Sequence, residues 1–174
     1  MLAEPKPLFS LTAADLMSGS LVTVPETMSL KAAARQLTQA AVTGAPVVHT
    51  NGRCVGVISS TDFLHWMNRN HVGQAACATS PSFWTAWKML DQDVLPDETV
   101  RDYMTRDPVM ALATATIGEL ARKMINVHIH RVIIVDQFDR PIGIVSSTDI
   151  LAAVAQASQI ANSENKATQP AGCC

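Results

Sequence analysis

The feature that most constrains this chain is an internal repeat. The tetrapeptide Ser59-Ser60-Thr61-Asp62 recurs as Ser146-Ser147-Thr148-Asp149, an offset of 87 residues. The same offset aligns residues 15–64 with the second half of the chain without a gap, and 14 of these 50 pairs are identical. Chance would give roughly one identity in seventeen. The chain is therefore a duplication, and its fold must be one that two copies of a single unit can build.

Both copies predict the same order of elements. A helical turn (Ala13 to Met17; Val100 to Met104) precedes a short extended piece (Leu21 to Val24; Val109 to Leu112). Ser29 and Thr116 then act as N-caps of amphipathic helices, the second with an apolar stripe. Two strands and a last helix follow. This order predicts a mixed α/β (α+β) fold of two tandem β-α-β-β-α units. The stripe comprises Ile117, Leu120, Ala121, Met124 and Ile125; the strands are Pro46 to Val48, Val55 to Ile58, Val132 to Val135 and Ile142 to Val145; the last helices begin at Thr61-Asp62 and Thr148-Asp149.

The repeat also divides the chain. We expect an N-terminal segment over 1–9, unit 1 over 10–67, a connector with a Trp-rich helix over 68–97, unit 2 over 98–155, and a polar, disordered tail over 156–174. All three tryptophans lie in or beside the connector. Its helix is either a partner or dimer surface or packs on the core of the protein itself, and aromatic side chains favour burial.

Composition narrows the classes of function. The chain is 48% hydrophobic and 16% charged, which suits a packed interior. A net charge of -2 gives no basic excess for nucleic-acid binding. No signal peptide and no membrane-length apolar run are visible. We therefore expect a soluble, cytoplasmic protein. The four cysteines fit neither a zinc template nor a disulfide framework, which indicates a reducing compartment.

The repeated Gly-x-x-Ser-Ser-Thr-Asp motif carries the polar chemistry. A glycine within a strand marks close approach by a ligand or another segment. Hydroxyls and a carboxylate then arrive at a helix start, where free N–H groups suit a phosphate and the carboxylate suits ribose hydroxyls. The same residues also form a capping-box signature, which would be purely structural. Duplication does not separate these readings, since structure duplicates as well as function.

The second copy adds His128-Ile129-His130-Arg131 before a strand, where the arginine could clamp a phosphate. Gly44 occupies the paired position, so the two copies cannot be equivalent. The histidines have no third ligand, so no metal is expected. No Walker loop, nucleophile elbow, Cys-x-x-Cys or His-Glu-x-x-His occurs, which predicts that the chain is not an enzyme.

Taken together, the motifs resemble a tandem pair of cystathionine-β-synthase-type (CBS) domains. The matching pieces are Asp15-Leu-Met-Ser18 with Asp102-Tyr-Met-Thr105, Thr43-Gly-Ala-Pro-Val-Val48 with His130-Arg-Val-Ile-Ile-Val-Asp136, and the two Gly-x-x-Ser-Ser-Thr-Asp runs. The resemblance implies a pseudo-two-fold pair with two composite clefts for an adenine nucleotide. It implies one cleft of Ser18, Val22, Thr23, Val42, Thr43, Ser146, Thr148 and Asp149, and another of Ser59, Thr61, Asp62, Thr105, Val109, Met110, Ile129, His130 and Arg131.

By the same resemblance, each aspartate would hold ribose, Ser59 or Ser146 would help to hold phosphate, and the apolar strand pieces would flank adenine. The implied ligands are AMP, ADP or ATP, with S-adenosylmethionine and NAD(H) as further family ligands. The implied role is an energy- or cofactor-sensing regulatory module that forms a homodimer and acts on a partner protein. The alternatives are a ligand-free homodimerising scaffold and, least supported, a nucleotide-processing enzyme. The chain departs from the family pattern at His49, where Asp is usual, at Gly44, and in its long connector.

Overall fold

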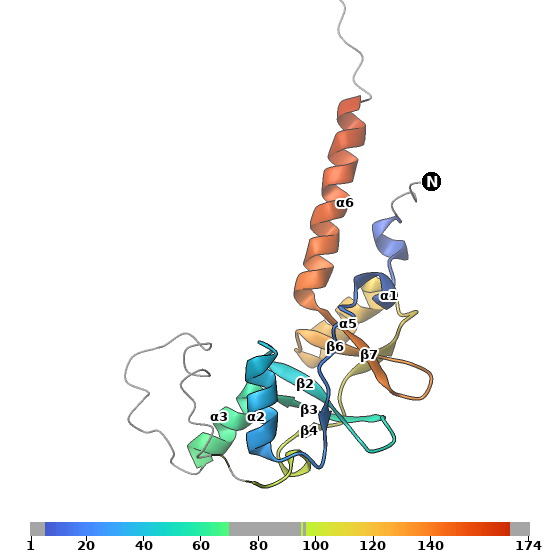
Figure 1. Cartoon of the computed structure of the whole chain (residues 1–174). Coiled ribbons are helices and arrows are strands. Elements are labelled where there is room, and N and C mark those ends of the chain that lie inside the picture. Colours follow the sequence, from blue (N-terminus) through green and yellow to red (C-terminus); the bar gives the residue numbers. More distant parts are fainter. Residues whose placement is uncertain (1–5, 70–94, 96, 168–174) are drawn as a thin grey trace, which may run out of the picture. The chain divides into compact units, whose positions relative to one another are not determined.

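The structure is a computed structural model that describes residues 6–69, 95 and 97–167 (Figure 1). The predicted connector helix lies outside the described residues, as do Cys77, Cys173 and Cys174. In the part of the chain that is described, no helix is both long and apolar enough to cross a bilayer.

Both copies form the predicted β-α-β-β-α series, so the mixed α/β fold is confirmed. The first copy runs β1 (Val24–Pro25), α2 (Leu30–Gln39), β2 (Gly44–Val48), β3 (Cys54–Ser59) and α3 (Ser60–Arg69). The second runs β5 (Met110–Leu112), α5 (Ile117–Val127), β6 (Arg131–Val135), β7 (Pro141–Ser146) and α6 (Ser147–Ala167). Short elements precede each series: η1 (Leu8–Ser10) and α1 (Ala13–Leu16) before the first, and η3 (Val100–Asp102) and β4 (Thr105–Arg106) before the second.

The compact units of the molecule are not continuous stretches of sequence. One unit comprises Ser20–Pro108 with Phe138–Pro141, and we call it the first-repeat unit. The other comprises the chain up to Gly19, Val109–Gln137 and the chain from Ile142 onward, and we call it the second-repeat unit. Each unit therefore contains the strands and long helices of one repeat and the starting segment of the other repeat. The starting segment of the first repeat comprises residues 6–19 with η1 and α1, and that of the second repeat comprises residues 98–108 with η3 and β4.

The first-repeat unit is built on a four-stranded sheet of order β1-β2-β3-β4. Strands β1 and β2 are parallel, whereas β2, β3 and β4 pair antiparallel. Ser29 caps α2, because its side chain accepts a hydrogen bond from the Ala32 N–H at 3.2 Å. One face of α2 then packs into the core, as the sequence period requires. The buried side chains include Leu30, Ala33, Ala34, Leu37, Val47, Ile58 and Phe63.

The second-repeat unit has a three-stranded sheet of order β5-β6-β7. Thr116 and Glu119 form a full capping box at the start of α5. Its core contains Ala13, Ala111, Leu120, Met124, Val132, Ile134 and Val145. The prediction for Ile125 is wrong, since that side chain is 69% exposed. At about 100° per residue, Ile125 lies beyond the edge of the stripe that Ile117, Leu120 and Met124 define.

The exchanged starting segments make equivalent contacts in the two units. In the first-repeat unit, Thr105 pairs with Val57 and Thr99 bridges Ser29. In the second-repeat unit, the residues one repeat away do the same, because Ser18 bridges Ile144 and Thr12 bridges Thr116. The exchange therefore follows the sequence repeat, and each unit completes its sheet or core with the start of the other repeat.

The strand glycines explain how closely these segments approach. A Cβ atom on Gly56 would lie 2.6 Å from Met104 Sδ and 2.8 Å from the Thr105 carbonyl oxygen. A Cβ atom on Gly143 would lie 2.6 Å from Met17 Sδ and 2.9 Å from Met17 Cβ. Of the two readings that a strand glycine allows, ligand or chain segment, a chain segment occupies this space in both units.

Two further details differ from the sequence analysis or extend it. Helix α6 continues to Ala167, where we expected a polar, disordered tail from residue 156. Alanines and other helix formers between 152 and 160 favour this continuation. Residues 138–141 belong to the first-repeat unit, where the Cys54 N–H donates to the Asp139 carbonyl at 2.9 Å and Arg53 pairs with the Asp139 carboxylate at 2.7 Å.

Candidate functional site

The first Ser-x-x-Asp motif places a carboxylate at the start of α3. Asp62 Oδ2 accepts hydrogen bonds from the Ser59 N–H at 2.7 Å and from the Ser59 hydroxyl at 2.8 Å. These bonds correspond to helix capping, one of the two roles that the sequence allows for this motif, because the side chain satisfies a backbone N–H at the helix end. The other oxygen, Oδ1, accepts a long hydrogen bond from the Thr105 hydroxyl at 3.4 Å. Capping therefore uses Oδ2, and Oδ1 takes no part in it.

The second motif repeats this geometry at the start of α6. Asp149 Oδ2 accepts from the Ser146 N–H at 2.7 Å and from the Ser146 hydroxyl at 2.6 Å. The Asp149 N–H donates back to the Ser146 hydroxyl at 3.3 Å, which completes a reciprocal box. Each serine thus uses its hydroxyl hydrogen within the motif. Thr61 and Thr148, one position before each aspartate, are exposed to solvent.

The residues implied by the family resemblance are divided between the two units. The first-repeat unit holds Val22, Thr23, Val42, Thr43, Ser59, Thr61, Asp62 and Thr105; the second-repeat unit holds Ser18, Val109, Met110, Ile129, His130, Arg131, Ser146, Thr148 and Asp149. Within the first-repeat unit, the fold brings Thr105 to Asp62. Within the second-repeat unit, Ser18 donates its N–H to the Ile144 carbonyl at 3.1 Å, two residues before Ser146.

Several of these residues also serve the fold through their backbone or apolar atoms. The Thr43 carbonyl accepts from the Ser60 N–H at 2.9 Å, and the His130 carbonyl accepts from the Ser147 N–H at the same distance. Val22 and Val42 pack against the first core, and Val109 and Ile129 pack against the second. The Thr23 carbonyl accepts from Gln36 Nε2 at 3.0 Å. The polar side chains of Thr105, His130 and Arg131 are exposed, with Thr105 and Arg131 on strands and His130 just before β6.

A pocket of about 320 Å³ opens at Asp62, inside the first-repeat unit. Its lining includes Asp62 and six residues that the sequence analysis did not select as site residues: His65, Trp66, Arg69, Asp102, Tyr103 and Met104. The signal was present, since residues 62, 65, 66 and 69 are spaced to share one face of a helix. A larger hollow of about 480 Å³ lies beside α2, and none of the predicted site residues lines it.

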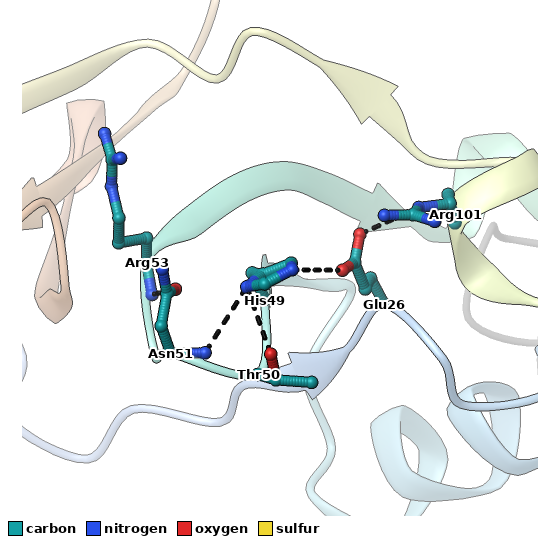
Figure 2. A network of polar contacts seen from close by, with 6 residues as sticks. All are labelled: Glu26, His49, Thr50, Asn51, Arg53 and Arg101. Carbon is teal, nitrogen blue, oxygen red and sulfur yellow. Dashed lines mark hydrogen bonds and ion pairs between the residues drawn. The ribbon is translucent and has the colours of Figure 1, made fainter.

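A buried carboxylate in the first-repeat unit holds the exchanged segment (Figure 2). Glu26 is only 4% exposed. Its side chain pairs with Arg101 Nε at 3.0 Å and with His49 Nε2 at 3.4 Å (Figure 2). The Asn51 N–H donates to His49 Nδ1 at 3.4 Å, which leaves Nε2 to carry the proton toward Glu26. His49, where the sequence departs from the family pattern, therefore has a structural partner.

Three titratable groups respond to their surroundings. Hydrogen bonds from Lys6, and then from the Thr12 N–H and hydroxyl, lower the pKa of Asp15 to about 2. Hydrogen bonds from the Thr116 N–H and hydroxyl lower the pKa of Glu119. Burial raises the pKa of the Cys54 thiol. Within the described ranges, no three His, Cys, Asp or Glu side chains come together as a metal site would require.

Comparison with known sequences gives the family directly. The CBS domain profile matches residues 13–69 and 100–156. An uncharacterized protein of Methanocaldococcus jannaschii is 31% identical over 123 residues, which cover 65% of this chain and 73% of that protein. The L-aspartate semialdehyde sulfurtransferase of the same organism is 28% identical over 85% of this chain, but the match spans only 24% of the enzyme.

Solved structures give the same result. CBSX2 in complex with AMP has a TM-score of 0.64 and 25% identity, over 84% of this chain and 98% of that one. The CBS domain of a CBS-domain-containing membrane protein from Sphaerobacter thermophilus has a TM-score of 0.64 and 26% identity, over 84% of this chain and 89% of that one. Two profile matches, a 31% identical relative and these folds together show that the chain belongs to the CBS domain family, as a tandem pair.

Proposed function

We propose that the protein is a regulatory module that binds an adenine nucleotide through its Ser-x-x-Asp motifs. The observation that carries this proposal is the state of Asp62, whose Oδ2 caps α3 and which also lines a pocket. A carboxylate fixed in this way is suited to two vicinal ribose hydroxyls, because it need not reorganise to accept them. The AMP complex of the similar protein CBSX2 supports the choice of ligand.

The motif geometry also predicts which hydroxyl would bind the phosphate of the nucleotide. Ser59 and Ser146 already donate their hydroxyl hydrogens to the aspartates. A phosphate oxygen would instead meet the exposed Thr61 or Thr148 hydroxyl at the helix start, where the helix dipole favours an anion. Arg131 and His130 are the side chains through which the second repeat would add positive charge.

The remaining parts of the proposal concern partners. We propose a homodimer that passes the bound state to a regulated protein and catalyses no reaction itself. The competing function is a ligand-free homodimerising scaffold, and the capping bonds of Asp62 and Asp149 favour it, since they account for both motifs without a ligand. The sulfurtransferase match does not favour an enzyme, because it spans a quarter or less of that protein.

A thermal-shift panel on nucleotide-free protein separates these functions. The panel contains AMP, ADP, ATP, S-adenosylmethionine, NAD and NADH, and a ligand at 100 times its Kd should add about 2.7 kcal/mol. That increment raises Tm by several degrees in a chain of this size. The variants are Asp62→Asn and Asp149→Asn, because an asparagine oxygen still accepts the capping bonds. A shift lost in the variants supports nucleotide binding, whereas no shift with any ligand supports the scaffold.

A further inference from the structure

The hollow of about 480 Å³ beside α2 lies in the first-repeat unit and shares no residue with the candidate nucleotide site. Two cations, Lys31 and Arg35, line it one helical turn apart. The apolar side chains of Met28 and Ala32 and one carboxylate, Asp97, also line it. The lining therefore offers one net positive charge together with a small apolar surface.

The end of the connector is fixed beside this hollow. Leu95 is buried in the same core as the apolar face of α2, and Asp97 lines the hollow itself. At the first turn of α2, the Leu30 N–H donates to the Glu98 carbonyl at 2.8 Å. The chain that precedes Leu95, which lies outside the described residues, therefore continues from a point beside the two cations.

The sequence just before that point has the opposite charge. Residues 89–94 read Met-Leu-Asp-Gln-Asp-Val, with two carboxylates and no cation. Three of the six side chains are apolar, which suits the Met28 and Ala32 part of the hollow. Opposite charges at such a surface favour association and set its register.

The spacing of the charges also fits. Asp93 precedes Asp97 by four residues, so an extended chain lets it reach about 14 Å from the edge of the hollow. Asp91 lies two residues further back, a step of about 7 Å in extended chain. Lys31 and Arg35 lie about 6 Å apart along the axis of α2. Two carboxylates at this spacing can therefore meet two cations, one pair each.

The second-repeat unit contains a described counterpart of this arrangement. Element η1 (Leu8–Ser10) lies 87 residues before residues 95–97, and Leu8 corresponds to Leu95. This element contacts α5, which corresponds to α2. The chain ahead of a starting segment thus packs on the first long helix of the unit that it joins.

The tether favours this segment over an acidic partner or a second copy. A short tether gives an attached segment an effective concentration in the millimolar range, so a weak intrinsic affinity is enough for docking. Any other acidic chain would have to displace it.

We infer that the hollow on α2 is the docking surface for residues 89–94 of the same chain, with Asp91 and Asp93 paired to Lys31 and Arg35. The inference goes beyond the proposed function and does not depend on nucleotide binding. It assigns the end of the connector to the surface of its own protein, one of the two roles that the sequence allows for the connector.

Limited trypsin digestion of the full chain tests the inference. Lys88 is the only lysine or arginine between Arg69 and Arg101, and cleavage after it needs residues 89–94 to be undocked. Mass spectrometry gives the initial rate of this cleavage, which follows the undocked population when undocking is fast. We expect Lys31→Gln/Arg35→Gln to raise the rate about 10-fold, or about 1.4 kcal/mol, which two exposed ion pairs can supply together.

Two further variants make the test specific. Asp91→Asn/Asp93→Asn should raise the rate equally, after division by the rate for a synthetic peptide of residues 83–94 with the same substitutions. Combining it with Lys31→Gln/Arg35→Gln should add nothing, because the two changes remove the same contacts. Arg122→Gln/Lys123→Gln on α5 is the matched control, since Arg122 corresponds to Arg35, and it should leave the rate unchanged.

The other outcomes overturn the inference. An unchanged rate in Lys31→Gln/Arg35→Gln, with the fold intact by far-UV circular dichroism, shows that the hollow does not hold the segment. Independent, multiplying effects of the two double variants show that these charges do not pair. Protection that grows with protein concentration shows that the segment of a second copy fills the hollow instead.

Discussion

The two compact units of this protein share one plan but differ in what holds the exchanged segment. In the second-repeat unit, the starting segment of the first repeat is held by backbone bridges from Thr12 and Ser18 and by Met17 against Gly143. The first-repeat unit has the equivalent contacts and adds a buried carboxylate, Glu26, paired with Arg101 of its exchanged segment. Ala113 occupies the position of Glu26 in the second repeat. The contacts that close the fold are thus shared by both units, whereas a buried carboxylate holds the exchanged segment in the first-repeat unit.

The strand glycines should show the largest effects on stability. Gly56→Ala would drive its Cβ into both Met104 and the backbone of β4, whereas Gly143→Ala meets only Met17 side-chain atoms among its nearest neighbours. Overpacking of this kind costs about 1–3 kcal/mol. We expect Gly56→Ala to reach the upper end of that range and Gly143→Ala to cost less. Urea unfolding measures both, and a larger loss for Gly143→Ala would contradict the comparison.

The Glu26 network should come next. Breaking a fully buried ion pair costs about 3–5 kcal/mol, but His49 is 41% exposed and Arg101 56% exposed, so solvent reduces the effect. We expect Glu26→Gln to lower the free energy of unfolding by about 1–2 kcal/mol. Asp139→Asn in the exposed pair with Arg53 is the control and should cost under about 1 kcal/mol. Similar losses for the two variants would show that the burial of Glu26 adds nothing to its pairing.

The helix caps should give smaller and more equal effects. Ser29→Ala and Thr116→Ala each remove a side chain that accepts a backbone N–H, and such caps contribute about 1 kcal/mol. Thr116→Ala should cost slightly more, because Thr116 also donates its hydroxyl to Glu119 in a two-way box. Chemical denaturation resolves this order, and a cap that costs nothing would show that its helix start is held by packing alone.

The smallest effect is the acid dependence contributed by Asp15. Its folded-state pKa of about 2 lies below the ordinary value of 3.8. Its contribution to stability is therefore fully present above pH 3.8 and is lost as the pH falls toward 2. Lys6→Gln should raise this pKa, since Lys6 is the largest cause of the shift. NMR titration of the Asp15 carboxyl carbon measures the change, and an unaltered pKa would show that Lys6 does not contact Asp15 in solution.

The sequence was sufficient for the elements because each is encoded locally. The caps at Ser29 and Thr116 and the alternation of apolar residues follow from neighbouring positions. Local pattern alone does not specify the exchange of starting segments, because either repeat offers the same partners to either start. The family resemblance did group Ser18 with the second Ser-x-x-Asp motif and Thr105 with the first, and Thr105 does contact Asp62. The pocket face of α3 was missed for a similar reason, since its spacing says that His65 and Arg69 share a face but not that Asp102 lies opposite.

Titration of nucleotide-free protein with AMP, using the double variant Asp62→Asn/Asp149→Asn, tests the central claim most directly. Asparagine retains an oxygen for each cap, so the fold should persist, which far-UV circular dichroism and urea unfolding check. We predict that wild-type protein binds AMP and that the double variant loses at least about 10-fold in affinity, or about 1.4 kcal/mol. A folded double variant that binds AMP as tightly as wild type would contradict the account, because both aspartates would then serve the helices alone.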